Sequence, residues 1–350
     1  MNEPLLKKVC NAPGVSGYED EAQAVVMEEL RACCDEVRRD RLGNVIALKK
    51  ATRPPAKGKR PLRVLLAAHV DEIGMLVKHI HDNGFIHFIQ MGGLNPRVCE
   101  SQRVIIHGRK PVRGVVVPKV DDKDGKDGKV ALEDLLIDTG LPKKKLKDLV
   151  EVGDIATFDE DVSLLNGKMW VGRNFDDRIG TYCLVEAMRQ VKNTSVDVYA
   201  VSSVQEEVGL RGMRPAAYGI DADIGIALDG SMARGAYVNE RQNLCEPGEG
   251  TGIYLVDNLT IGHRGLLRFL YDLCRKHKIR YQKNVGGGTD ASAIQQSRAG
   301  VIATTVGAPV RYMHSTVQLC HADDMDATVA MLVKFMEHAH EFPAGDTGRP

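Results

Sequence analysis

Continuous apolar segments alternate with segments of helical period along this chain. The segment LRVLLAAHV, residues 62–70, lacks the apolar and polar alternation of a half-exposed strand, so it predicts a strand that is covered on both faces. GNVIALKK, residues 43–50, predicts a strand just before it. Strands that alternate with helices are typical of a doubly wound sheet. The sequence therefore predicts the α/β fold class, with a doubly wound mixed sheet.

The remaining segments of this alternation extend it to the end of the chain. Apolar residues recur at helical period from Glu19 to Val37 and again from Asp177 to Val191, which predicts an amphipathic helix over each range. Further strands are expected at 196–204, 222–230 and 300–308, and further helices at 265–278 and 323–340.

A β-rich stretch interrupts the alternation between residues 74 and 167. Short β-rich pieces such as GFIHFIQMGG, QRVIIHG and PVRGVVVPKV are separated by Gly, Pro and Asp turns, with one short helix expected near 142–150. We therefore expect a small β-rich domain at 74–167, inserted into a larger domain at 1–73 and 168–342, and a tail at 343–350. VDDKDGKDGK, residues 120–129, lacks the acid spacing of an EF-hand and is expected to be an exposed loop.

The charge balance excludes several classes of partner. Lys and Arg number 47 and Asp and Glu number 47, so no global positive field attracts nucleic acid or an anionic membrane. No signal-like or bilayer-length apolar run occurs, which favours a cytoplasmic protein. The eight cysteines form no C-x-x-C pair and are expected to be reduced and mostly buried.

Histidines and carboxylates recur where predicted strands end or a helix begins. The carboxyl ends of strands line the binding crevice of an open α/β sheet, so these side chains are expected to meet there. The residues are His69 and Asp71 in AAHVDEIG, Asp176 and Asp177 in GRNFDDRIG, Glu206 and Glu207 in QEEVG, Asp229 in IALDG, and His314 in RYMHS.

Each of these residues has a structural interpretation when it is taken alone. Asp176 or Asp177 would cap a helix, Asp229 would belong to an Asp-Gly turn, and a lone histidine is more often a satisfied core or surface residue. Their joint placement favours a shared site. GGGTD, residues 286–290, lacks the pattern of a nucleotide-binding loop.

The residue types suit two divalent cations. Two histidines and three carboxylates, one of them bridging, fit Zn²⁺, Co²⁺ or Mn²⁺ held about 3.5–4 Å apart, as in two-metal hydrolases. Cations also explain why Glu206 and Glu207 follow an apolar strand, because buried carboxylates need compensating charge. Successive strand residues point to opposite faces, so one glutamate is expected to bind metal and the other to act as a general base.

The ordered set of motifs resembles the metal-dependent aminopeptidases of the tetrahedral (TET) group, the glutamyl aminopeptidase and endoglucanase-M-like family. AHVDEIGMLV, GRNFDDRIG, QEEVGLRG, IALDG, GGGTDA and RYMHS occur in the family order, and LLIDTG lies within the insertion. The resemblance covers nearly the whole chain. The segment VVVPKVDDKDGKDGKV differs from relatives, which often have a Pro-His stretch there.

The resemblance implies a role for each matching position. His69 and Asp229 are similar to the ligands of one metal, Glu207 and His314 to those of the other, and Asp176 to the bridging ligand. Glu206 is similar to the general base, and Asp71 to the residue that orients His69. Asp177 has no ligand role in this pattern and is expected to be a helix-start acid.

The resemblance also implies an assembly and a reaction. The inserted β-rich domain would form dimers, which would assemble into a tetrahedral dodecamer. The expected reaction removes N-terminal residues from short peptides: a water activated by two cations attacks the peptide carbonyl, and Glu206 takes its proton and passes it to the leaving amine. The resemblance does not specify the preferred N-terminal residue.

Three rival functions remain. A deacylase or carboxypeptidase would need a cationic clamp, for which Arg211, Arg234 and Arg311 are candidates. A glycosidase would use Glu206 and Glu207 about 5–9.5 Å apart, which adjacent residues hardly reach. A non-catalytic assembly protein is disfavoured because all seven expected site positions are filled.

Overall fold

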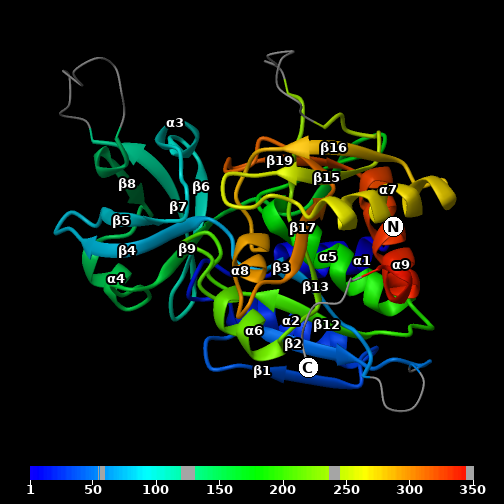
Figure 1. Ribbon diagram of the computed structural model, residues 1–350. Helices are drawn as coiled ribbons and strands as arrows, with labels where there is room; N and C mark the ends of the chain where they lie inside the picture. The colour runs from blue at the N-terminus through cyan, green and yellow to red at the C-terminus, as the bar shows by residue number, and fades with distance from the viewer. Residues whose placement is uncertain (54, 56–59, 120–130, 236–244, 344–350) are drawn as a thin grey trace.

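A mixed eight-stranded sheet forms the centre of the larger part of the protein (Figure 1). The computed structural model describes residues 1–53, 55, 60–119, 131–235 and 245–343. The strand order is β1-β2-β12-β3-β13-β17-β15-β16, and the four strands β12, β3, β13 and β17 run parallel. The bounds are β1 Glu36–Arg39, β2 Val45–Lys49, β3 Arg63–His69, β12 Asp197–Ser203, β13 Ile224–Leu228, β15 Thr251–Val256, β16 Tyr281–Val285 and β17 Ile302–Gly307.

Helices cover both faces of this sheet, which confirms the predicted α/β fold class. In β3, Val64, Leu66 and Ala68 pack into the hydrophobic cluster that contains the long helices, whereas Leu65 and Ala67 pack into a second cluster on the other face. The first cluster includes α1 Glu3–Asn11, α2 Asp20–Arg31, α5 Phe175–Gln190, α7 Arg264–Lys276 and α9 Ala322–His338, and the second includes α6 Met213–Ile220 and α8 Ala291–Gln295.

The helix predicted from Glu19 to Val37 is shorter than expected, and that prediction was wrong at its C-terminal end. Helix α2 ends at Arg31, and Val37 lies in β1, where it pairs with Ala47 of β2. Val37 continues the apolar spacing of the helix in the sequence. Pairing with β2 overrides that local pattern, because the spacing of apolar residues within one segment does not show which later segment pairs with it.

A closed barrel lies beside the central sheet and has a hydrophobic core of its own (Figure 1). Its strand order is β4-β5-β8-β7-β6-β9, with Val104, Ile106 and Phe88 among the buried core residues. The bounds are β4 Gly74–Ile80, β5 Ile86–Met91, β6 Arg103–His107, β7 Pro111–Pro118, β8 Leu135–Asp138 and β9 Ile155–Phe158, with helices α3 Pro96–Cys99 and α4 Lys143–Lys147. The β-rich segments expected between residues 74 and 167 form the strands of this barrel. The limits of the inserted domain stay a prediction.

A smaller five-stranded sheet lies next to the central one, in the order β10-β11-β19-β18-β14. Its strands are β10 Ser163–Asn166, β11 Met169–Gly172, β14 Ser231–Met232, β18 Pro309–Arg311 and β19 Gln318–His321. This sheet matters for the site because β18 leads into the segment that contains His314.

The remaining sequence expectations concern cysteines, membrane spans and two segments. All eight cysteines are free and six are buried, as predicted. Within the described part of the chain, no helix has both the length and the apolar character of a membrane span. The loop expected at 120–129 and residues 344–350 of the expected tail lie outside the described residues.

Candidate metal centre

The carboxyl ends of adjacent parallel strands place the predicted site residues. His69 is the last residue of β3, Asp229 follows Leu228 at the end of β13, and the Glu206–Glu207 pair follows β12. Strands β12 and β13 both flank β3 in parallel, so their C-terminal ends lie at one edge of the sheet. The structure thus brings together side chains that are 160 residues apart in the chain.

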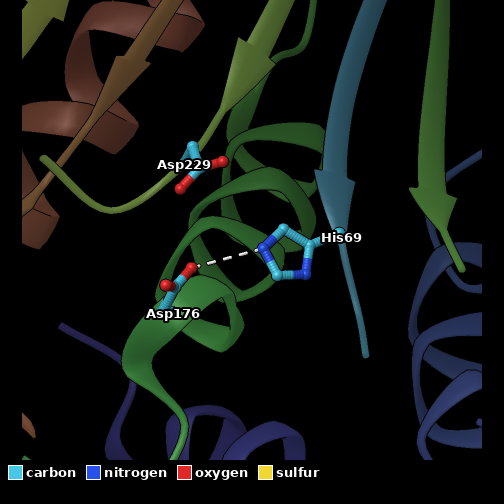
Figure 2. Close-up of side chains that lie close together, drawn as sticks. All are labelled: His69, Asp176 and Asp229. Carbon is cyan, nitrogen blue, oxygen red and sulfur yellow. Dashed lines mark hydrogen bonds and ion pairs between the residues drawn. The ribbon is translucent and has the colours of Figure 1, made fainter. Parts of the chain in front are cut away.

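Asp176 lies at the middle of the cluster and faces two histidines. Its Oδ1 is 3.3 Å from Nε2 of His69, and its Oδ2 is 3.3 Å from Nε2 of His314. Figure 2 shows the ring of His69 facing the carboxylate of Asp176, with Asp229 on the same side of the ring. Asp176 stands at the non-helical start of α5, where its backbone N–H donates to Oε1 of Gln318 at 2.7 Å. That hydrogen bond holds the carboxylate in place from the backbone side.

Two groups of potential ligands share Asp176. His69, Asp176 and Asp229 form one group and Asp176, Glu207 and His314 the other, with the ligand atoms of each group within 4.8 Å of one another. In the second group, Nε2 of His314 is 3.4 Å from Oε2 of Glu207. The arrangement has the form of two adjacent cation sites with a common carboxylate.

Asp71 lies behind the first group and is fully buried. Its Oδ1 is 3.4 Å from Nδ1 of His69, and its backbone oxygen is 3.1 Å from the same nitrogen. Nδ1 therefore faces oxygen atoms of Asp71 while Nε2 points toward Asp176. This orientation leaves Nε2 as the nitrogen that is available to a cation.

The chain turns directly after β12, so the opposed directions expected for Glu206 and Glu207 in a strand do not apply. Gln205 has φ of +54°, and both glutamates line the same pocket. Glu206 belongs to neither ligand group, and its Oε2 is 3.9 Å from Nε2 of His69. The two glutamates thus lie at one site with different surroundings.

Burial and mutual repulsion disfavour ionisation of three carboxylates in the cluster. Burial, and then the charge of Asp176, raises the pKa of Glu207 to about 8. Burial also raises the pKa of Asp229 well above its usual range, with Asp176 and Asp177 adding to the effect. For Glu206, burial raises the pKa strongly despite the attraction of His69. The protein alone does not compensate this negative charge.

The histidines and Asp176 show the opposite behaviour. Burial opposes ionisation of Asp176, but His314 and His69 outweigh it and hold the pKa of that carboxyl low. The hydrogen bond to Asp176 is the main reason that the pKa of His314 is raised to about 9. Burial disfavours a charged His69, but Glu206, Asp176 and Asp71 outweigh burial and raise its pKa.

The donor set fits a pair of divalent cations. Each ligand group offers one imidazole nitrogen and two carboxylates, which suit borderline ions such as Zn²⁺. A cation at each group would replace the protons that burial otherwise holds on Glu207 and Asp229, because positive charge favours the ionised carboxylates. The physical need for positive charge thus coincides with the ligand geometry.

A pocket of about 380 Å³ opens onto the cluster. Asp176, Glu206, Glu207, Asp229 and His314 form its polar part. The other lining residues are Gly230, Met232, Tyr254, Gly287, Gly288, Thr289 and Met313. The pocket therefore combines potential ligands and a spare carboxylate with lining residues that are mostly apolar.

The three candidate arginines of the rival clamp lie elsewhere. Arg211, Arg234 and Arg311 are absent from the lining of this pocket, and no lysine or arginine lines it within the described ranges. Arg311 donates from Nε to the backbone oxygen of Arg234. The side chain of Arg234 forms an ion pair with Glu246, with 3.6 Å between Nε and Oε2.

Several residues that support the site were missed at the sequence level. Ser16 donates to Asp71 at 2.6 Å, and Asp290, buried beside the cluster, accepts from Ser203 at 2.5 Å. Glu72 forms a buried ion pair with Arg173, with 2.8 Å between Oε2 and Nε. Glu72 lies in the segment HVDE and Asp290 in GGGTD, so both acids belong to motifs that the sequence analysis already singles out. No such motif surrounds Ser16.

Comparisons with known proteins identify the family of this chain. A sequence model of the M42 glutamyl aminopeptidase family matches residues 43–331. The lysyl aminopeptidase of Pyrococcus furiosus is 33% identical over 346 residues, covering 95% of this chain and 96% of that protein. An aminopeptidase of the archaeon Desulfurococcus kamchatkensis superposes with a TM-score of 0.90 at 34% identity, covering 96% of this chain and 94% of its own. The TET1 peptidase of Pyrococcus horikoshii, which can assemble into a tetrahedron or a large octahedral shell, has a TM-score of 0.83 at 30% identity, with coverage of 95% and 98%.

Proposed function

We propose that this chain, which belongs to the M42 glutamyl aminopeptidase family and is an aminopeptidase, removes N-terminal residues from short peptides in the pocket lined by Asp176. The family predicted from the sequence is confirmed. One observation supports the location most strongly. Asp176 faces His69 with one carboxylate oxygen and His314 with the other, and the unassigned carboxylate of Glu206 lines the same pocket.

In this proposal the chain holds two divalent cations, which would be Zn²⁺, Co²⁺ or Mn²⁺. His69 and Asp229 would bind one, Glu207 and His314 the other, and Asp176 both. When bound, the cations would supply the positive charge that makes a water acidic and polarises a peptide carbonyl.

Glu206 is proposed as the general base. It lines the pocket but belongs to neither ligand group, so its carboxylate is free to accept a proton from the attacking water. The same carboxyl then donates that proton to the nitrogen of the leaving peptide, which departs as an amine.

Asp71 is proposed to position the reacting groups without touching the substrate. It is fully buried and absent from the pocket lining. Its oxygens fix the ring of His69 and accept the backbone N–H groups of Glu206 and Glu207. The base and two proposed ligands therefore share a single rigid support.

The lining of the pocket favours an aminopeptidase over the rival deacylase or carboxypeptidase. A carboxylate-binding clamp requires a cationic side chain, and the described lining contains none apart from the imidazole of His314. We propose instead that the free α-amine of the substrate lies beside the acidic end of the pocket, where the carboxylates attract it.

The proposal extends to domains, assembly and location. We propose a catalytic domain at 1–73 and 168–342, a dimerisation domain at 74–167, and dimers that assemble into a tetrahedral dodecamer. The separate core of the barrel supports an independent unit, and the tetrahedral assembly of the Pyrococcus horikoshii relative supports the higher order. We also propose a cytoplasmic location.

A pair of substrates tests the reaction. The purified full-length protein is assayed with leucine p-nitroanilide and with its N-acetyl form, before and after treatment with a chelator and resupply of Zn²⁺, Co²⁺ or Mn²⁺. We expect hydrolysis of the free-amine substrate alone, loss of activity with the chelator, and recovery with at least one ion. Release of acetate from the acetylated substrate, without release of p-nitroaniline from the free-amine substrate, would favour a deacylase and overturn the proposal.

A further inference from the structure

Beside the potential ligands, the pocket has an apolar wall. Met232, Tyr254 and Met313 line it. The hydroxyl of Tyr254 donates to the backbone oxygen of Gly230 at 2.7 Å, so this polar atom is satisfied within the protein. What Tyr254 offers to a ligand is therefore the face or edge of its ring.

A run of glycines keeps this wall hollow. A Cβ at Gly286 would lie 3.7 Å from Sδ of Met232, one at Gly287 3.9 Å from Cε1 of Tyr254, and one at Gly288 3.3 Å from Cδ1 of Leu259. Gly286 and Gly287 have φ of +103° and +86°, a region that favours glycine. Side chains at these positions would fill the space between the run and the apolar residues. The glycines thus leave room for a side chain that comes from a ligand.

We propose that this wall receives the side chain of the substrate's N-terminal residue and selects large apolar side chains, namely those of leucine, methionine and phenylalanine. This inference rests on the proposed function, because it assumes that the scissile bond lies at the cluster of Asp176. An apolar side chain in such a pocket loses contact with water and gains contact with methionine and an aromatic ring.

The charges around the pocket argue against acidic and basic N-terminal residues. Every described carboxylate that lines it belongs to the ligand groups or is Glu206, and no described lysine or arginine lines it. A glutamate or lysine side chain of the substrate would lose hydration at the wall without gaining a partner. The inferred preference therefore differs from the one in the name of the related lysyl aminopeptidase of Pyrococcus furiosus.

The two methionines also indicate how strict the selection is. Met232 is 42% exposed at the rim, and an unbranched thioether adapts to ligands of different shape. We expect leucine, methionine and phenylalanine to be cleaved at similar rates, each at least about tenfold better in kcat/KM than alanine, since a few methylenes in an apolar pocket discriminate on this scale.

A substrate panel tests the inference. The metal-loaded protein is assayed with p-nitroanilides of leucine, methionine, phenylalanine, alanine, glutamate and lysine. We expect the three large apolar substrates to exceed glutamate and lysine by at least about tenfold in kcat/KM. The highest kcat/KM for glutamate or lysine would overturn the inference and leave the aminopeptidase intact, whereas no hydrolysis of any free-amine substrate would overturn the proposed function itself.

Two variants test whether the apolar wall determines which N-terminal residue is preferred. Met232→Lys adds a cation at the exposed rim and is expected to raise the ratio of glutamate to leucine hydrolysis about tenfold or more. Gly288→Val adds bulk where Leu259 is free to shift, since Leu259 is 54% exposed, and is expected to lower kcat/KM for phenylalanine more than for alanine. Met169→Lys on β11, outside the pocket, is the matched control and is expected to leave both ratios unchanged. Unchanged ratios in both pocket variants would show that another surface selects the substrate.

Discussion

Oδ1 of Asp71 accepts a hydrogen bond from the backbone N–H of Glu206 at 3.0 Å. Its Oδ2 accepts from the N–H of Glu207 at 3.1 Å and from the hydroxyl of Ser16 at 2.6 Å. With His69 3.4 Å away, one carboxylate meets both glutamates and a histidine. Asp71 thereby fixes the segment that follows β3 against the segment that follows β12, although the two are more than a hundred residues apart in the chain.

Replacement of this carboxylate tests its positioning role. Asp71→Asn would place an NH₂ group where one oxygen now accepts hydrogen bonds, leaving buried donors unsatisfied. We expect a loss of about 1–3 kcal/mol in the free energy of unfolding and a fall of about 10–100-fold in metal affinity or kcat/KM. Urea unfolding, metal titration and steady-state kinetics measure these changes. Asp272→Asn, at a side chain that is 72% exposed, is the control, and equal behaviour of the two variants would contradict the role.

Substitution of Glu206 and substitution of Glu207 are expected to have different effects on kcat and on metal content. Glu206→Gln removes a proton acceptor and is expected to lower kcat by about 10²–10⁴-fold while the metal content is retained. Glu207→Gln removes a ligand and is expected to lower the metal content, with partial recovery of activity at high metal concentration. Elemental analysis alongside kinetics distinguishes the two. The reverse pattern would exchange the roles of the two residues.

Much of the fold was predictable because its signals are local. The apolar run of β3 indicated burial on both faces, and the structure places Leu65 and Leu66 in separate clusters on opposite faces of the sheet. His69 and Asp229 could be placed at one edge because parallel strands end there. These inferences need only the period of the sequence and the rules of sheet topology.

Other features depend on contacts that no local pattern encodes. Val37 fits a helical period, yet it pairs with β2 in the structure. The turn at Gln205 brings both glutamates to the pocket, although strand geometry alone would separate them. Gln318 holds the backbone of Asp176, and it is 142 residues away with no motif around it. Such partners appear only once the chain is folded.

The pH dependence of stability is expected to differ between metal-free and metal-loaded protein. The pKa of Glu207 is raised to about 8 in the folded metal-free protein, from an ordinary value of 4.5. The folded state then binds an extra proton between these values, so its stability is fully present below pH 4.5 and decreases as the pH rises through 8. The slope is about 1.4 kcal/mol per pH unit for one proton. Asp229 and Glu206, whose pKa values are also raised by burial, add in the same direction.

Bound cations would remove this penalty, because they stabilise the ionised carboxylates. We therefore expect the difference in unfolding free energy between metal-loaded and chelator-treated protein to increase from pH 5 to pH 8. Urea unfolding of both forms at three pH values measures it. A difference that is constant or decreases with pH would contradict the assignment of these acids as cation ligands.

The buried ion pair of Glu72 and Arg173 links the exit of β3 to the entry of α5. Glu72 also accepts hydrogen bonds from the N–H of Gly14 at 3.1 Å and from Nδ2 of Asn174 at 3.1 Å. Its side chain is 2% exposed and that of Arg173 is 5% exposed. Because Glu72 follows Asp71 and Arg173 lies three residues before Asp176, this pair fixes the spacing between the two sides of the metal centre.

Glu72→Gln tests the contribution of this pair. Glutamine keeps the shape of the side chain but leaves the buried guanidinium of Arg173 without a counter-charge, which typically costs about 3–5 kcal/mol. We expect urea unfolding to show a loss of that size and metal titration to show weaker binding, while kcat at saturating metal stays close to that of the parent protein. Glu36→Gln, at a surface pair whose glutamate is 61% exposed, is expected to change stability by less than about 1 kcal/mol. A selective loss of kcat in Glu72→Gln, with stability unchanged, would instead place Glu72 in the reaction, since a residue that only braces the centre acts through the folding and metal-binding equilibria.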